Sequence, residues 1–135
     1  MPRPRYRTLA HGADLRVALW GVDAEELIRN AVVAAGTLAL GRLPRIPVRR
    51  RIRVQPWPAD LPSMLVRAVN EALFHLYTKR QVALEFTLGP GGGTLGVADL
   101  PRGHKPELEV KAATYHDLRP RRRDRRLTAM LTLDV

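Results

Sequence analysis

The chain has 135 residues, of which 45% are hydrophobic and 27% are charged, and it contains no cysteine. This length predicts a single domain over residues 1–135 with one hydrophobic core, and the missing thiols exclude disulfides, thiolate metal sites and cysteine nucleophiles. Residues 31–40 form the longest apolar stretch, much shorter than the roughly 20 residues of a membrane-spanning helix. The basic N-terminus also lacks the apolar segment of a secretory signal. We therefore expect a cytoplasmic protein without membrane contact.

The net charge of +10 comes almost entirely from two arginine segments. Residues 42–53 hold six arginines and no acid, and residues 119–126 hold six arginines and one acid. Their charges, +6 and +5, leave 10 − 11 = −1 for the rest of the chain. Such segments are typical of contacts with RNA or an acidic partner, but solvated strand faces and hairpins carry them as well. The candidate contacts are Arg49, Arg51, Arg53, Arg121, Arg122 and Arg123.

A strand and a long helix are the first predicted elements. Apolar residues alternate with others over residues 15–21, which is typical of a half-buried strand. Asp23 can cap the helix that follows, because its carboxylate can accept hydrogen bonds from first-turn amides. Glu26 stands three residues later, as in a capping box. Apolar residues recur at helical spacing until Gly41, where we expect the helix to end.

A second strand and a second helix are predicted next. Over residues 46–54, apolar side chains alternate with arginines, which predicts a strand with one buried face and one basic face. Pro56 and Pro58 cannot continue a ladder of hydrogen bonds. The second helix begins near Asp60, and Pro62 is tolerated in its first turn.

After residue 80 the sequence predicts mainly strands, over residues 81–88, 93–100, 107–116 and 126–135. The glycine-rich residues 89–93 are interpreted as a hairpin turn, because they lack the Gly-Lys-Ser/Thr ending of a phosphate-binding loop. Residues around Pro120 are interpreted as an exposed hairpin connection. We therefore predict an α+β domain in which both helices pack on one face of a mainly antiparallel sheet.

Three carboxylates stand where they could bind a metal ion. Asp14 opens the first predicted strand, Asp134 lies near the end of the last one, and the α-carboxylate of Val135 adjoins it. If these two strands are neighbours, the oxygens converge on a hard cation such as Mg²⁺ or Ca²⁺. Alternatively, Asp134 pairs with an arginine or faces water, and the spacing alone leaves both possibilities open.

Few residues indicate catalysis. Tyr115 and His116 could form a proton-transfer pair with Lys111 as a nearby cation, but no serine or threonine has an evident base and orienting group. Trp20, Trp57 and the two phenylalanines are too few and too scattered for the stacking platform of a single-strand-binding protein. We interpret these aromatic residues as part of the core.

Two segments together resemble the archease family. AHGADLRVALWGVDAEELIRNAVVA, residues 10–34, is similar to the family's opening His-Thr-Ala-Asp, its strand and its acidic helix start. RGHKPELEVKAATYHDL, residues 102–118, resembles the family's Arg-His, Glu-Val-Lys-Ala and Thr-Tyr-His sequence. Between them NEALFHLYTKRQV, residues 70–82, matches the end of the second helix, and the chain ends on an apolar strand closing with Asp-Val. The resemblance covers nearly the whole chain.

The resemblance implies an α+β fold built on a strand-helix-strand-strand module and a role as a protein cofactor, not an enzyme. The resemblance further implies that this protein activates an RtcB-type RNA ligase, an enzyme that joins RNA ends by means of GTP and a guanylylated histidine. Such an activator promotes guanylylation and multiple turnover in tRNA splicing or RNA repair. By position, a divalent metal (Ca²⁺ or Mg²⁺/Mn²⁺) would bind to Asp14, Asp134 and Val135. Lys111 and, more weakly, His116 would contact the ligase.

The chain departs from the family pattern at three places. Gly12 replaces the usual threonine, Arg67 stands where an Asp-Trp pair often occurs, and residues 42–53 are arginine-rich where many relatives are acidic. These departures leave the metal residues Asp14, Asp134 and Val135 unchanged. The alternative hypothesis is a basic RNA-binding module or RNA chaperone that acts through the arginine segments. A metal-dependent nuclease is disfavoured because no second metal site or general base is evident.

Overall fold

The computed structural model describes residues 5–11 and 14–135, which form two α-helices, one short π-helix and eight strands. The helices are α1 (Ala24–Leu40), α2 (Leu61–Phe74) and the π-helix η1 (His75–Lys79). The strands are β1 (Tyr6–His11), β2 (Asp14–Gly21), β3 (Arg50–Arg53), β4 (Gln81–Gly89), β5 (Gly92–Asp99), β6 (Ala112–Thr114), β7 (Arg121–Arg123) and β8 (Arg126–Asp134). None of the described helices is long and apolar enough to cross a membrane.

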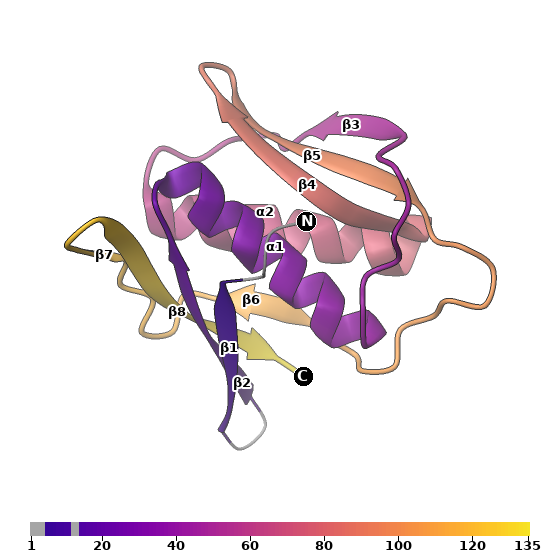
Figure 1. The fold of residues 1–135 in the computed structure, drawn as a ribbon, viewed down its shortest axis with the longest axis horizontal. Coiled ribbons are helices and arrows are strands. Elements are labelled where there is room, and N and C mark those ends of the chain that lie inside the picture. Colours follow the sequence, from indigo (N-terminus) through magenta and orange to yellow (C-terminus); the bar gives the residue numbers. More distant parts are fainter. Residues whose placement is uncertain (1–4, 12–13) are drawn as a thin grey trace.

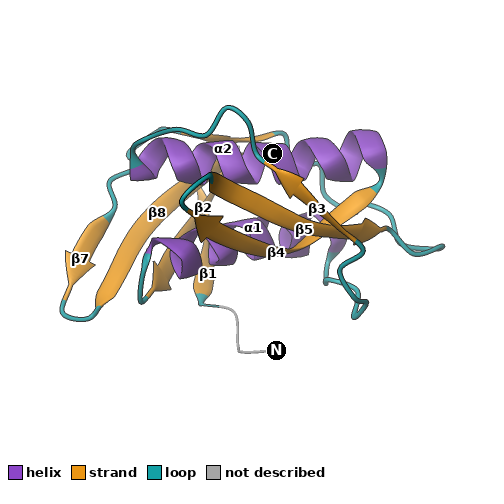
Figure 2. Ribbon diagram, turned by 90° about the horizontal axis from the view of Figure 1, so that it is seen from above, coloured by secondary structure: helices purple, strands orange, loops and turns teal. Residues whose placement is uncertain are grey.

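The strands form two antiparallel sheets. In the first sheet the order is β1-β2-β8-β6, with β7 also paired to β8, and in the second it is β3-β5-β4. Helix α1 packs against β2 of the first sheet, β4 of the second sheet and α2 (Figure 1). Figure 2 shows the same arrangement from above. The predicted α+β class is confirmed, although the strands are divided between two sheets and α1 contacts both.

One hydrophobic core joins the helices to both sheets. Val17 and Leu19 of β2 and Leu131 and Leu133 of β8 are buried on the side of the first sheet that faces α1. Phe86 of β4 is buried in the same core from the second sheet. Because side chains alternate along a strand, the residues between these positions point to the other side of the first sheet. We call that side the outer face; it carries Asp14, Arg16, Ala18, Trp20, Thr128, Met130, Thr132 and Asp134.

Both predicted helix starts are confirmed. The Asp23 carboxylate accepts a hydrogen bond of 2.8 Å from the Glu26 amide, and the Glu26 carboxylate accepts one of 3.1 Å from the Val22 amide. The Asp60 carboxylate accepts one of 3.0 Å from the Ser63 amide. The two aspartates satisfy first-turn amides that have no partner within the helix, and Glu26 binds the amide of Val22, which precedes the Asp23 cap. Local capping chemistry therefore predicted where each helix begins.

Several strands differ from the prediction. β1 was not predicted. The exposed hairpin expected around Pro120 is present, and its first arm is the short strand β7, which pairs with β8. Of the strand expected over residues 46–54, only β3 has regular strand structure, and of the one expected over residues 107–116, only β6 does. In the latter segment, the amides of Glu107 and Leu108 donate to Ala39 at the end of α1. Those amides are therefore not available for a strand ladder. The hairpin between β4 and β5 is confirmed.

Candidate functional site

Asp14 and Asp134 lie directly opposite each other in the antiparallel pairing of β2 and β8. The condition set by the sequence, that the first predicted strand and the last one are neighbours, is therefore met. Directly opposed residues project from the same face of a sheet, with Cα atoms about 4.5–5.5 Å apart. Both carboxylates consequently stand side by side on the outer face, and both residues are half-buried.

The two opposed carboxylates are a candidate cation site. Two like charges directly opposite each other destabilise a strand pair. Among the side chains that the structure describes, none forms an ion pair with Asp14 or Asp134, so the arginine partner considered for Asp134 is not found there. Val135 adjoins Asp134 and packs partly against the core. The described residues hold no group of three Asp, Glu, His or Cys side chains suited to a metal, so a site here would depend on the two aspartates together with the α-carboxylate.

The backbone of Lys111 is hydrogen-bonded to the end of the first sheet that carries Asp14 and Asp134. Its amide donates a hydrogen bond of 2.8 Å to the carbonyl oxygen of Asp134, and its side chain is exposed. It lines a surface hollow of about 630 Å³ together with Tyr77, Glu107 and Glu109. The predicted ligase-contact residue is therefore joined to Asp134 through its backbone, while its exposed side chain lines a hollow to which neither Asp14 nor Asp134 contributes.

Tyr77 holds the segment that carries Lys111. Its hydroxyl donates a hydrogen bond of 3.0 Å to the Leu108 carbonyl and accepts one of 2.8 Å from the Val110 amide. Burial raises the pKa of Tyr77, so the hydroxyl keeps the proton that it donates at neutral pH. Sequence reasoning missed this role, and no local pattern indicates it because the bonded residues are about 30 positions away in the chain.

Asn70 connects α2 to the same region. Its side-chain amide donates to the Ala113 carbonyl at 3.2 Å, and its side-chain oxygen accepts from the Ala113 amide at 2.7 Å. The structure turns Asn70 toward β6, a role that sequence reasoning missed. A polar residue between buried helix positions was the signal that could have identified it.

His116 lies near the carboxylates without being beside them. Its carbonyl accepts a hydrogen bond of 3.4 Å from Thr132, which lies two residues before Asp134 on β8, roughly 7 Å along the strand. Its imidazole is exposed and lies 3.3 Å from the Asp117 carboxylate. In the described residues His116 is thus a surface group at the margin of the site.

The two arginine segments lie on different sheets. β3 and β7 are far apart in both views of the molecule (Figures 1 and 2), so the segments do not form one basic surface. Around β3, Arg51 lies 3.5 Å from Glu85, and Arg53 donates to the Gly91 carbonyl at 2.6 Å. Arg49 is exposed, as are all three arginines of β7, Arg121, Arg122 and Arg123. The alternation predicted for residues 46–54 is confirmed, with apolar residues more buried than the arginines.

The sequence pattern of the Archease protein family (MTH1598/TM1083) matches residues 6–135. Protein archease of Archaeoglobus fulgidus is 27% identical over 137 residues, which is 97% of this chain and 99% of that protein. Protein archease of Thermoplasma acidophilum is 26% identical over 117 residues, 84% of this chain and 82% of that protein.

Two solved structures share the fold. One is the solution structure of Methanobacterium thermoautotrophicum protein 1598, with a TM-score of 0.68, 23% identity, and coverage of 98% of this chain and 100% of that one. The other is the crystal structure of an archease, described as a possible chaperone, from Thermotoga maritima, with a TM-score of 0.66, 17% identity, and coverage of 100% and 98%. Because the family pattern extends from β1 to Val135, this chain belongs to the archease family.

Proposed function

We propose that this protein is a cytoplasmic cofactor of an RtcB-type RNA ligase and promotes ligase guanylylation and multiple turnover in tRNA splicing or RNA repair. The observation that carries the proposal is the placement of Asp14 opposite Asp134, with Lys111 hydrogen-bonded to Asp134 through its backbone. These are the residues to which the family resemblance assigns function. The Thermotoga maritima structure is described as a possible chaperone, which agrees with action through a partner protein.

In this proposal Asp14, Asp134 and the α-carboxylate of Val135 hold a divalent cation, Ca²⁺ or Mg²⁺/Mn²⁺. Carboxylate oxygens are suitable ligands for such hard cations, and a bound cation would supply positive charge beside the phosphates of the ligase's nucleotide. Lys111 adds a second positive charge at the same end of the sheet. Tyr77 and Asn70 position the backbone on either side of Lys111 through their hydrogen bonds. The protein thus organises the ligase's active site and forms no covalent bond itself.

The test is multiple-turnover RNA joining by a purified RtcB-type ligase with and without this protein. The wild type should stimulate joining, whereas Asp14→Asn and Lys111→Ala should stimulate it much less. Asp99→Asn is the matched control, because Asp99 is an exposed carboxylate at the end of β5 in the second sheet. Full stimulation by Asp14→Asn, or none by the wild type, would refute the proposed mechanism.

The alternative function, a basic RNA-binding module acting through the arginine segments, has weaker support. Arg50 and Arg51 of β3 already lie near Asp99 and Glu85, and exposed ion pairs of this kind reduce the charge available to phosphate. The β7 arginines have no ion-pair partner among the described residues. This alternative predicts salt-sensitive RNA binding without ligase, weakened by removing Arg121, Arg122 and Arg123.

A further inference from the structure

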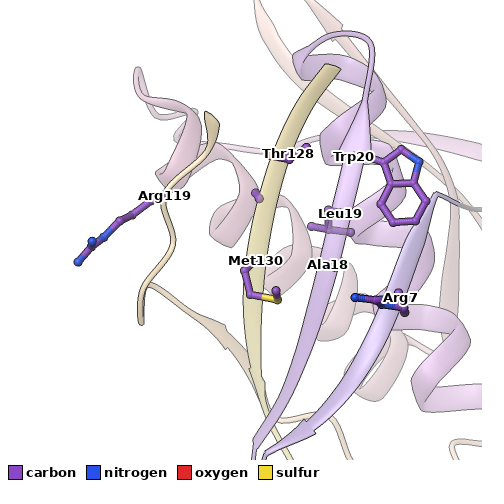
Figure 3. Close-up of a pocket in the computed structure, with 8 residues that line it drawn as sticks. Arg7, Ala18, Leu19, Trp20, Arg119, Thr128 and Met130 are labelled. Carbon is purple, nitrogen blue, oxygen red and sulfur yellow. The ribbon is translucent and has the colours of Figure 1, made fainter. Parts of the chain in front are cut away.

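The outer face of the first sheet has a second feature at the end away from the carboxylates. A surface hollow of about 430 Å³ lies over β2 and β8 (Figure 3). Its outward side chains are Arg7, Ala18, Trp20, Arg119, Thr128 and Met130. Neither the opposed aspartates nor Lys111 lines this hollow, so it is distinct from the site described above.

Trp20 does not belong to the core, contrary to the interpretation from sequence. Leu19 is buried against α1, and the adjacent Trp20 therefore points to the outer face, where it stays partly exposed. Trp57, by comparison, packs against the core and against Phe86, with ring centroids 5.7 Å apart. A partly exposed indole on an open sheet face is a surface on which another planar group can stack.

Two arginines line the hollow. Arg7 lies on β1, directly opposite Ala18, and stands near Trp20, while Arg119 lies on the other side of β8 (Figure 3). Arg121 of β7 is opposite Thr128 and extends the positive charge. Among the described residues no acidic side chain lines the hollow. The side chain of Arg119 is 73% exposed and lies 3.8 Å from Asp117, an exposed pair that leaves most of the guanidinium accessible.

This combination fits single-stranded nucleic acid better than an acidic protein segment. Arginine matches phosphate in a bidentate geometry, and bases stack on exposed aromatic rings in single-strand-binding proteins. The hollow falls within the roughly 300–1,000 Å³ of small-ligand sites, which accommodates a base and its sugar. Its remaining side chains are small or apolar apart from Thr128, so they can accept any base.

We propose that the outer face of the first sheet binds single-stranded RNA, with one base stacked on Trp20 and phosphates at Arg7 and Arg119. The choice of RNA over DNA rests on the proposed function. Trp20 and Asp14 are six residues apart on β2, about 20 Å at strand spacing. Between them on the outer face lies Thr132, which is only 1% exposed and donates a hydrogen bond to the His116 carbonyl. The bound strand is therefore confined to the Trp20 end of the face.

The test measures RNA binding in the absence of ligase. The probe is a labelled single-stranded oligouridine of about 12 nucleotides, within the size range of single-strand sites, followed by fluorescence anisotropy at low salt. Trp20→Leu keeps an apolar side chain but removes the ring, whereas Trp20→Phe keeps a ring. Arg49→Ala is the charge-matched control, because Arg49 is exposed near the second sheet. Thermal unfolding verifies that each variant is folded.

We expect Trp20→Leu to weaken binding about 5- to 150-fold, the effect of losing one base stack, and Trp20→Phe to retain most of the affinity. Arg7→Ala and Arg119→Ala should each weaken binding and lower the salt slope by about one, whereas Arg49→Ala should have no effect. Unchanged affinity of Trp20→Leu, or a larger loss with Arg49→Ala, would overturn the inference.

Two further measurements identify the ligand class. Equal affinity for oligothymidine would overturn the assignment to RNA. If the wild type binds no RNA and Trp20→Leu no longer co-purifies with the ligase, the outer face is a protein-docking surface. That result would also overturn the RNA-binding inference. The joining assay is independent of these outcomes: stimulation by the wild type without RNA binding would refute this inference and leave the proposed function standing.

Discussion

Replacing Asp134 with asparagine tests the metal site through the stability of the protein. The substitution keeps the size of the side chain and removes one of two like charges that face each other across β2 and β8. Such a pair costs about 0.2–1 kcal/mol relative to a neutral one. The Coulomb repulsion between two unit charges about 5 Å apart in water is similar, about 0.8 kcal/mol. In a chelator, Asp134→Asn should therefore be more stable than the wild type.

A divalent cation should reverse this order. A ligand present at about 100 times its dissociation constant stabilises the folded state by roughly 2.7 kcal/mol. A domain of this size gains roughly 4 °C in melting temperature per kcal/mol. The wild type should then melt about 10 °C higher with saturating Ca²⁺, Mg²⁺ or Mn²⁺, whereas Asp134→Asn should hardly respond because it lacks one of the carboxylates.

The assay is thermal unfolding of both proteins with chelator and with each cation. Asp99→Asn is the control, because it removes a carboxylate from the second sheet and should leave the response to metal unchanged. Two results would refute the reasoning: an equal metal response in the wild type and Asp134→Asn, or a lower stability of Asp134→Asn in chelator.

Three other substitutions test the surrounding structure and the partner. Asn70→Ala removes two hydrogen bonds to the Ala113 backbone and should lower the free energy of unfolding in urea by about 1–3 kcal/mol; an unchanged midpoint would contradict this. Lys111→Ala removes an exposed cation, so melting should not change, while ligase stimulation should fall about tenfold or more, since a hydrogen bond from a charged group contributes roughly 1.5–3 kcal/mol. The Ser63 amide holds the pKa of Asp60 below its ordinary 3.8. The contribution of this cap is therefore present above that value and is lost as the pH falls through the lowered pKa. Asp60→Ala should be less stable than the wild type at neutral pH, and the difference should disappear in acid; a constant difference across the pH range would show that the charge is irrelevant.

Trp20 shows that the residue type alone can predict the wrong burial for a side chain. Tryptophan is usually assigned to the interior, yet the alternation of Val17 and Leu19 already placed Trp20 on the opposite face of its strand. The alternation was in the sequence, but only the tertiary structure showed that the described helices pack on the side of Val17 and Leu19 and leave Trp20 on the other side. Composition therefore did not reveal that Trp20 is accessible to a ligand.

The sequence by itself determined both helices, the alternation of the arginine-bearing strand and the hairpin between β4 and β5. These features depend on capping groups, periodicity and turn residues that act over a few positions. Only the tertiary structure decided that the strands divide into two sheets, that Asp14 faces Asp134, and that Tyr77 and Asn70 hold the backbone near Lys111. Each of these involves groups far apart in the chain, and which distant strands and loops meet depends on how the whole core packs. The two arginine segments show the same division: their charge is a property of the sequence, and their separation on two sheets is a property of the fold.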